Sequence, residues 1–140
     1  MSSFLMCEPA YFALTEPINP WMGSQGKLDL QKAYAQWANA KQLLEKAGAK
    51  ITVISAQPGL QDMTFCADAG IVNDNKVLLA NYKYPARKSE AQHFKKWFAE
   101  KGYEINTSQE LFEGGDVVCT DNIAVCGTGI RSSAYINSVL

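Results

Sequence analysis

Apolar residues between Leu30 and Ala47 recur at alternating steps of three and four, at positions 30, 33, 37, 40, 44 and 47. This spacing places them on one face of an α-helix. Gly48 follows as a left-handed helix stop. A second stripe, which ends at Gly102, predicts another helix through Ala91, Phe94, Trp97 and Phe98. Ser89 and Gln92 fit a capping box at its start.

Short β-branched and apolar runs predict strands on both sides of these helices. The runs are residues 4–8, 51–55, 65–72, 76–82 and 103–108, with 73–75 as a hairpin turn. Two further strands, 116–120 and 122–127, are expected to pair around Asp121-Asn122. Ser132 and Ser133 are candidate N-caps of a third helix, whose apolar stripe would be Tyr135, Ile136, Val139 and Leu140.

The chain carries an internal echo. "EKAGAKITVIS" and "AEKGYEINTS" both run from a helix end through glycine into a strand. The echo predicts a repeated unit of two strands, a helix and a strand, present about two and a half times. We therefore expect an α/β fold that forms one domain over residues 1–140 and is part of a larger architecture.

Composition narrows the class of protein. The chain is 47% hydrophobic and 19% charged, which is typical of a globular protein. A net charge of −1 argues against a nucleic-acid or acidic membrane partner. No apolar run reaches the roughly 18 residues of a membrane span, and the first residues do not resemble a signal peptide, so we expect a cytoplasmic protein. The four cysteines form no CxxC pair, which favours buried free thiols over disulfides.

Candidate chemistry begins in "QDMTFCADAG", where Asp62 and Asp68 interrupt an apolar run. In a straight strand their even separation puts both side chains on one face, with Phe65 facing away unless a bulge turns it. Asp62 alternatively lies in the preceding loop. Buried acids need a cation, either an internal arginine or a ligand. The simpler interpretation is an aspartate at a strand end that caps a turn.

Two later segments add charged candidates. "LFEGGDVV" places Glu113 and Asp116 around a double glycine, where backbone can approach another group closely. Ordinary hairpin chemistry would explain the same pattern. "CGTGIRSS" holds Arg131 between a glycine-rich loop and a helix start, a placement that suits carboxylate recognition. An exposed arginine without a function is the alternative.

Taken together, several motifs resemble the guanidino-group-modifying enzymes, the superfamily of arginine deiminases, dimethylarginine dimethylaminohydrolases and amidinotransferases. The motifs are "MCEP", "INPWM", "GAKITVISAQPGLQDMTFCADAGIV", "PARKSE", "WFAEKGYEI", "FEGGDVV" and "GTGIRSS". The resemblance is to the N-terminal half, nearest to the "INPWM" branch. It implies a pentein-like α/β propeller, five-bladed in the family and partial here, built from about two and a half ββαβ modules.

The resemblance also implies roles for individual residues. Asp68 would grip a substrate guanidinium, and Glu113 would orient a catalytic histidine. The residues implied to line the site or meet the amino-acid end of the substrate are Asp62, Phe65, Arg87 and Arg131, with Asn19 in a loop above it. No metal ion or cofactor is implied, because the acids suit an organic cation and there is no cluster of histidine and cysteine ligands.

The family's chemistry needs a cysteine thiolate that forms a thiouronium intermediate and a histidine that transfers protons. His93 and the four cysteines do not match those positions, so the chain is expected to be inactive alone. Three accounts stay open: part of a longer hydrolase acting on arginine or methylarginine, a non-catalytic guanidinium-binding module, or self-association through an open propeller edge. An amidinotransferase is a further alternative. Asp68, where relatives often carry asparagine, favours hydrolysis, whereas Ala67 makes dimethylarginine a doubtful substrate.

Overall fold

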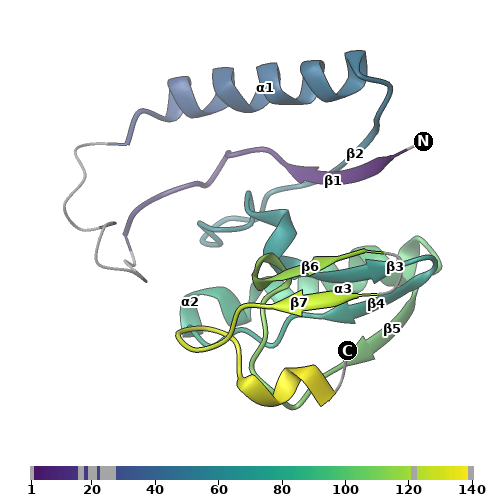
Figure 1. Cartoon of the computed structure of the whole chain (residues 1–140). Helices are drawn as coiled ribbons and strands as arrows, with labels where there is room; N and C mark the ends of the chain where they lie inside the picture. The colour runs from purple at the N-terminus through teal and green to yellow at the C-terminus, as the bar shows by residue number, and fades with distance from the viewer. Residues whose placement is uncertain (1, 16–17, 19–21, 23–27, 121–122, 139–140) are drawn as a thin grey trace. The chain divides into compact units, whose positions relative to one another are not determined.

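The computed structural model describes residues 2–15, 18, 22, 28–120 and 123–138. The chain divides into two compact units, residues 1–66 and 67–140, and each is described by itself. Both combine helices with short strands, as the sequence pattern predicts (Figure 1). The organisation as one domain stays a prediction.

The first unit is a strand–helix–strand repeat. Strand β1 (Ser3–Cys7) pairs in parallel with β2 (Lys50–Ile54), and helix α1 (Leu30–Lys46) connects them (Figure 1). Parallel neighbours require such a crossover, because a tight turn would reverse the chain. The helix begins where Asp29 accepts a hydrogen bond from the backbone N–H of Lys32 at 2.9 Å.

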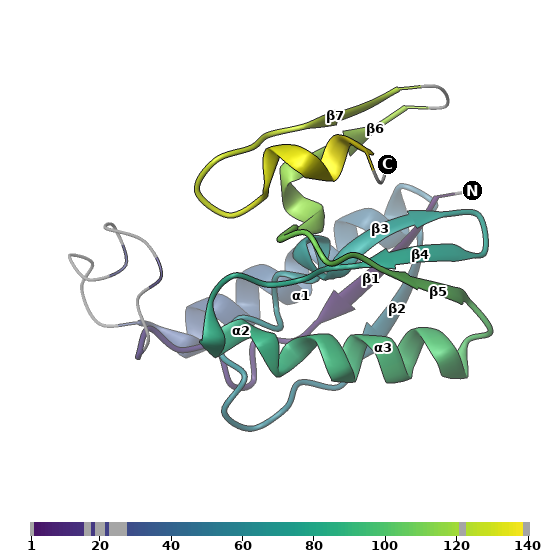
Figure 2. The same cartoon turned by 90° about the horizontal axis from the view of Figure 1, so that it is seen from below.

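The second unit contains a complete ββαβ repeat. Its sheet has the order β3 (Gly70–Asn73), β4 (Lys76–Leu79) and β5 (Glu104–Thr107), with the first pair antiparallel and the second parallel. Helix α3 (Glu90–Glu100) lies along one face of this sheet (Figure 2). Phe94 and Phe98 on α3 are buried, as are Val77 and Leu79 on β4. The repeated unit predicted from the internal echo is confirmed here.

Both predicted helix stops have the expected backbone conformation. Gly48 has φ +87° and Gly102 has φ +81°, in the left-handed region that side chains disfavour. The hairpin turn between β3 and β4 is also confirmed, with Asp74 at φ +52°. Aspartate tolerates this conformation better than most residues.

A second hairpin follows in the same unit. Strands β6 (Val117–Cys119) and β7 (Ala124–Cys126) are antiparallel, as predicted, and the turn residues 121–122 lie outside the described residues. The helical segment after it is a short 3₁₀-helix, Ala134–Ser138. Just before this helix, Oγ of Ser133 accepts a hydrogen bond from the backbone N–H of Tyr135 at 3.2 Å. The last two residues of the predicted stripe, 139 and 140, also lie outside the described residues.

Several predictions of local structure are wrong. Residues 65–72 do not form one strand: Cys66–Ala69 is a 3₁₀-helix, and β3 starts only at Gly70. The argument that Asp62 and Asp68 share a strand face therefore fails, and Asp62 lies in a turn. The capping box also fails. Ser89 follows directly on the short helix α2 (Pro85–Lys88), has helical backbone angles and makes no side-chain cap.

The thiol prediction holds in part. None of the four cysteines is in a disulfide, but only Cys7 is buried, and Cys119 is exposed. Among the helices that the structure describes, none is both long and apolar enough to cross a membrane.

Candidate functional site

A buried arginine brings two of the predicted acids together in the second unit. Nη1 of Arg87 lies 2.6 Å from Oδ2 of Asp68 and 3.3 Å from Oε2 of Glu113. Arg87 follows β4 on α2, Asp68 precedes β3 in the 3₁₀-helix, and Glu113 precedes the turn Gly114–Asp116. Arg87 is 1% exposed and Glu113 is fully buried, so the contact lies in the interior.

The second predicted arginine reaches the same carboxylate from the surface. Nη1 of Arg131 lies 2.9 Å from Oε2 of Glu113, and Nη2 donates to Asp116. Ser132 fixes the segment: its Oγ accepts from the Glu113 backbone N–H at 3.1 Å and donates to Asp116 at 2.7 Å. About a third of the Arg131 side chain stays exposed.

Sequence reasoning missed one member of this group, Glu90. Its fully buried carboxylate accepts hydrogen bonds from Nε of Arg87 at 3.3 Å and from Nη2 at 3.0 Å. The i, i+3 spacing of an arginine and a glutamate was the available signal. Asp116 was noted beside the double glycine but not placed in the site. We call the set of six side chains the carboxylate–arginine cluster: Asp68, Arg87, Glu90, Glu113, Asp116 and Arg131.

The electrostatics follow from burial and pairing. Burying a charge is costly unless partners compensate it. Burial raises the pKa of Glu113 above its ordinary value of 4.5, although Arg131 and Arg87 oppose the rise. Burial acts to lower the pKa of Arg87, but its interactions with Glu90, Tyr82 and Asp68 together outweigh burial, and the pKa is raised. Cζ of Arg87 lies over the ring of Tyr82, 4.6 Å from the ring centroid, in a cation–π contact.

One oxygen of the cluster remains unmatched. All described hydrogen bonds to the Glu113 carboxylate end on Oε2, and Oε1 is buried with no hydrogen-bond partner among the described residues. Asp68 likewise receives its hydrogen bond from Arg87 on Oδ2, while Oδ1 lies beside Gly115, where a Cβ would overlap it. A buried acceptor without a donor is costly, and a ligand N–H would satisfy it.

The remaining predicted site residues belong to the first unit or are not described. Asp62 is 1% exposed, and its Oδ2 lies 3.4 Å from Nε2 of Gln61. Gln61 in turn accepts a hydrogen bond from the hydroxyl of Thr15 at 2.8 Å. Phe65 is half-exposed and meets Phe12 edge to face, with ring centroids 5.7 Å apart. Asn19 lies outside the described residues, so its predicted role stays a prediction.

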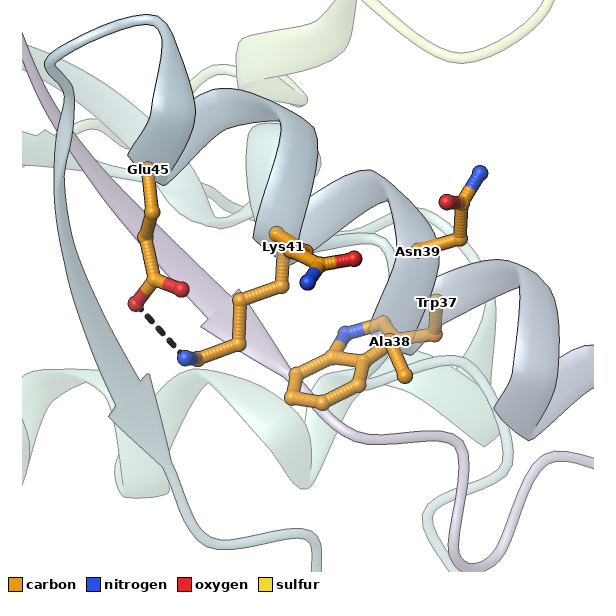
Figure 3. A pocket seen from close by; sticks show the side chains of 6 residues that line it. Trp37, Ala38, Asn39, Lys41 and Glu45 are labelled. Carbon is orange, nitrogen blue, oxygen red and sulfur yellow. Dashed lines mark hydrogen bonds and ion pairs between the residues drawn. The ribbon is translucent and has the colours of Figure 1, made fainter.

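A separate hollow occurs on the first unit. A cavity of about 450 Å³ lies along α1 and is lined by Trp37, Ala38, Asn39, Lys41, Gln42 and Glu45 (Figure 3). Nζ of Lys41 and Oε1 of Glu45 are 2.6 Å apart, and the two side chains are 31% and 44% exposed. None of the predicted site residues lines it. Across the part of the chain that the structure describes, no group of histidine, cysteine and acidic side chains is arranged to hold a metal ion.

Proteins with related sequences include a dimethylarginine dimethylaminohydrolase and an arginine dihydrolase. No family model matches the chain. It is 31% identical over 130 residues to the N(G),N(G)-dimethylarginine dimethylaminohydrolase of Mycobacterium tuberculosis, a match that covers 92% of this chain and 43% of the relative. It is 36% identical over 103 residues to the bifunctional arginine dihydrolase/ornithine cyclodeaminase AgrE of Nostoc, which covers 73% of this chain and 14% of that protein.

The solved structures agree. The N-terminal domain of ArgZ, a cyanobacterial arginine dihydrolase crystallised with its product, matches 98% of this chain and is 52% covered by it, with a TM-score of 0.93 and 29% identity. The chain belongs to the guanidino-group-modifying superfamily. The chain also has the fold of the dimethylarginine dimethylaminohydrolase from Pseudomonas aeruginosa, at a TM-score of 0.82 and 18% identity. The predicted pentein-like α/β fold is thus confirmed.

The chain spans only part of the length of these curated relatives, 43% of the Mycobacterium tuberculosis enzyme and 14% of AgrE. The carboxylate–arginine cluster contains four of the residues to which the resemblance assigns a role: Asp68, Arg87, Glu113 and Arg131.

Proposed function

We propose that the carboxylate–arginine cluster binds the guanidinium of arginine or a methylated arginine, as the substrate-holding part of a hydrolase. The observation that carries the proposal is the buried Oε1 of Glu113, an acceptor that no described donor reaches. It lies on a carboxylate that shares one arginine nitrogen with Asp68, so the two acids are close neighbours. A planar cation with several N–H donors is the natural complement of such a pair.

The other end of the ligand would be held by Arg131. This arginine is the more exposed of the two in the cluster, so it can turn part of its donor edge to a carboxylate. The amino-acid end of arginine carries that carboxylate. The roles that the resemblance implies for Asp62, Phe65 and Asn19 stay predictions.

The proposed reaction follows the family's chemistry. A cysteine thiolate attacks the guanidinium carbon, a histidine protonates the leaving amine, and water then cleaves the covalent thiouronium and restores the thiolate. His93 and the four cysteines do not match the family's positions for these groups. We therefore expect the 140-residue chain to bind its ligand without turnover, in a cytoplasmic setting and without metal ion or cofactor.

Two alternative functions would require different binding partners. An amidinotransferase would need a second amine acceptor. A non-catalytic module would bind a guanidinium or a second copy of itself through an open strand edge. Among the described residues, β1 and β2 form a sheet of two strands, and each strand has an unpaired edge. Such edges can pair with a second copy of the chain. Sedimentation at several concentrations distinguishes this association from ligand binding.

Calorimetric titration with L-arginine tests the proposal. We expect Asp68→Asn to weaken binding at least about tenfold, because a charge-assisted hydrogen bond is worth about 1.5–3 kcal/mol. Asp74→Asn is the matched control, since it removes the same charge from an exposed hairpin turn in the same unit. Assays for citrulline, ammonia and dimethylamine run beside it. Binding that survives Asp68→Asn, or steady turnover by the chain alone, would contradict the proposal.

A further inference from the structure

Glu90 is the buried carboxylate of the cluster to which neither the sequence motifs nor the proposed function gives a role of its own. It is fully buried at the first position of α3, and its two oxygens face the Nε and Nη2 edge of Arg87. An ordinary helix N-terminus would keep such an acid in water, where the helix dipole favours it at little cost. Burial therefore calls for a specific partner, and that partner is Arg87.

The hydrogen bonds between Glu90 and Arg87 determine where the rest of the guanidinium points. A guanidinium is planar and rigid, so fixing one edge fixes the direction of the opposite nitrogen. Hydrogen bonds from Nε and Nη2 to Glu90 hold that edge, and the Tyr82 ring centroid lies 4.6 Å from Cζ. Nη1 then faces Asp68 at 2.6 Å and Glu113 at 3.3 Å.

We propose that Glu90 is a positioning residue: it holds Arg87 so that Nη1 fixes the Asp68 and Glu113 carboxylates in the geometry that binds the ligand. This inference rests on the proposed function. It differs from the role that the resemblance implies for Arg87, which is contact with the amino-acid end of the substrate. Arg87 is 1% exposed and its donors engage three protein carboxylates, so it acts from beneath the site.

The matched pair of variants is Glu90→Gln and Glu100→Gln. Both remove one negative charge from the two ends of the same helix, but Glu100 is exposed and pairs only loosely with Lys96 at 3.9 Å. Glu90→Asp is the conservative rescue, because it restores the charge on a shorter side chain and also serves if Glu90→Gln does not fold.

The first measurement needs no ligand. The Nε–H signal of Arg87, assigned by its loss in Arg87→Lys, and the carboxyl ¹³C signals of Asp68 and Glu113 are followed by NMR. We expect Glu90→Gln to shift all three, Glu90→Asp to return them toward the unmodified protein, and Glu100→Gln to leave them in place. Carboxyl signals of Asp68 and Glu113 that stay unchanged in Glu90→Gln would overturn the proposal, whatever happens to the melting temperature.

The second measurement is calorimetric titration with L-arginine. We expect Glu90→Gln to raise the Kd about tenfold or more, since small displacements of binding groups are costly, and Glu90→Asp to recover part of the loss. A Kd within twofold of the unmodified protein would overturn the proposal. If the unmodified protein does not bind arginine, the proposed function fails, while the ligand-free spectra still decide whether Glu90 positions the two acids.

Discussion

The two strand–helix–strand repeats, β1–α1–β2 and β4–α3–β5, share element order and parallel pairing but differ in what the helix buries. No side chain of α1 is buried, whereas α3 buries Glu90, Phe94 and Phe98. In each repeat, a glutamate of the helix takes part in an ion pair. Lys41 and Glu45 lie on the surface of α1, while Arg87 and Glu90 lie in the interior of the second unit.

The difference shows that the backbone repeat does not by itself determine function. A buried ion pair needs further partners, and in the second unit these partners are the acids of the cluster. The exposed pair on α1 needs none, because water already solvates both charges. We therefore expect the same type of substitution to lower the free energy of unfolding by different amounts in the two repeats.

The largest effect is expected from Arg87→Ala. Removing this guanidinium takes away the hydrogen bonds that Arg87 donates to Glu90 and leaves Glu113 with one arginine fewer. The cost is about 3–5 kcal/mol in the free energy of unfolding. Lys41→Ala, in the exposed pair of the first repeat, should cost about 0.5 kcal/mol or less. Urea unfolding is followed by the fluorescence of Trp97 for the second unit and Trp37 for the first, each in a background without the other tryptophans. Equal losses would remove the proposed contrast.

A smaller contrast is expected in apolar packing. Phe94 is fully buried, so Phe94→Ala should lower the free energy of unfolding by about 3 kcal/mol. Leu44 on α1 is only half-buried, and Leu44→Ala should cost about 1 kcal/mol. The same two fluorescence probes report both losses. A cost for Leu44→Ala as large as that for Phe94→Ala would mean that α1 packs as tightly as α3.

The smallest expected effect is a change of the free energy of unfolding with pH. The pKa of Glu113 is raised in the folded protein, so between 4.5 and the folded pKa the folded state binds more protons at this site than the unfolded state. Its contribution to stability is therefore complete below 4.5 and is lost as the pH rises through the folded pKa. The difference in unfolding free energy between the unmodified protein and Glu113→Gln should fall across this interval. A difference that rises with pH would show that Arg87 and Arg131 outweigh burial.

The sequence predicted much of the fold because local signals agreed with it. The helix from Leu30, the stops at Gly48 and Gly102 and the turn at Asp74 all follow from short-range preferences. Residues 66–69 were predicted wrongly as strand, because an apolar run of this length is compatible with either a strand or a helical turn.

The site was predicted unevenly for a different reason. Asp68, Arg87, Glu113 and Arg131 are brought together as the motifs suggested. Glu90 was missed because a glutamate at a helix start is ordinarily solvated, and only the burial of Arg87 makes it part of the interior. The pairing of these charges joins residues far apart along the chain, such as Arg87 with Glu113 and Arg131 with Asp68, which local patterns do not report.

The hydrogen that stands in place of a side chain at Gly115 has a consequence for how this protein can diverge. A Cβ there would overlap Oδ1 of Asp68, 47 residues earlier in the chain, so a larger residue requires this side chain to move away from its contact with Arg87. A descendant that replaces Gly115 must also withdraw its aspartate. In a collection of natural variants, the two positions should therefore drift together or not at all.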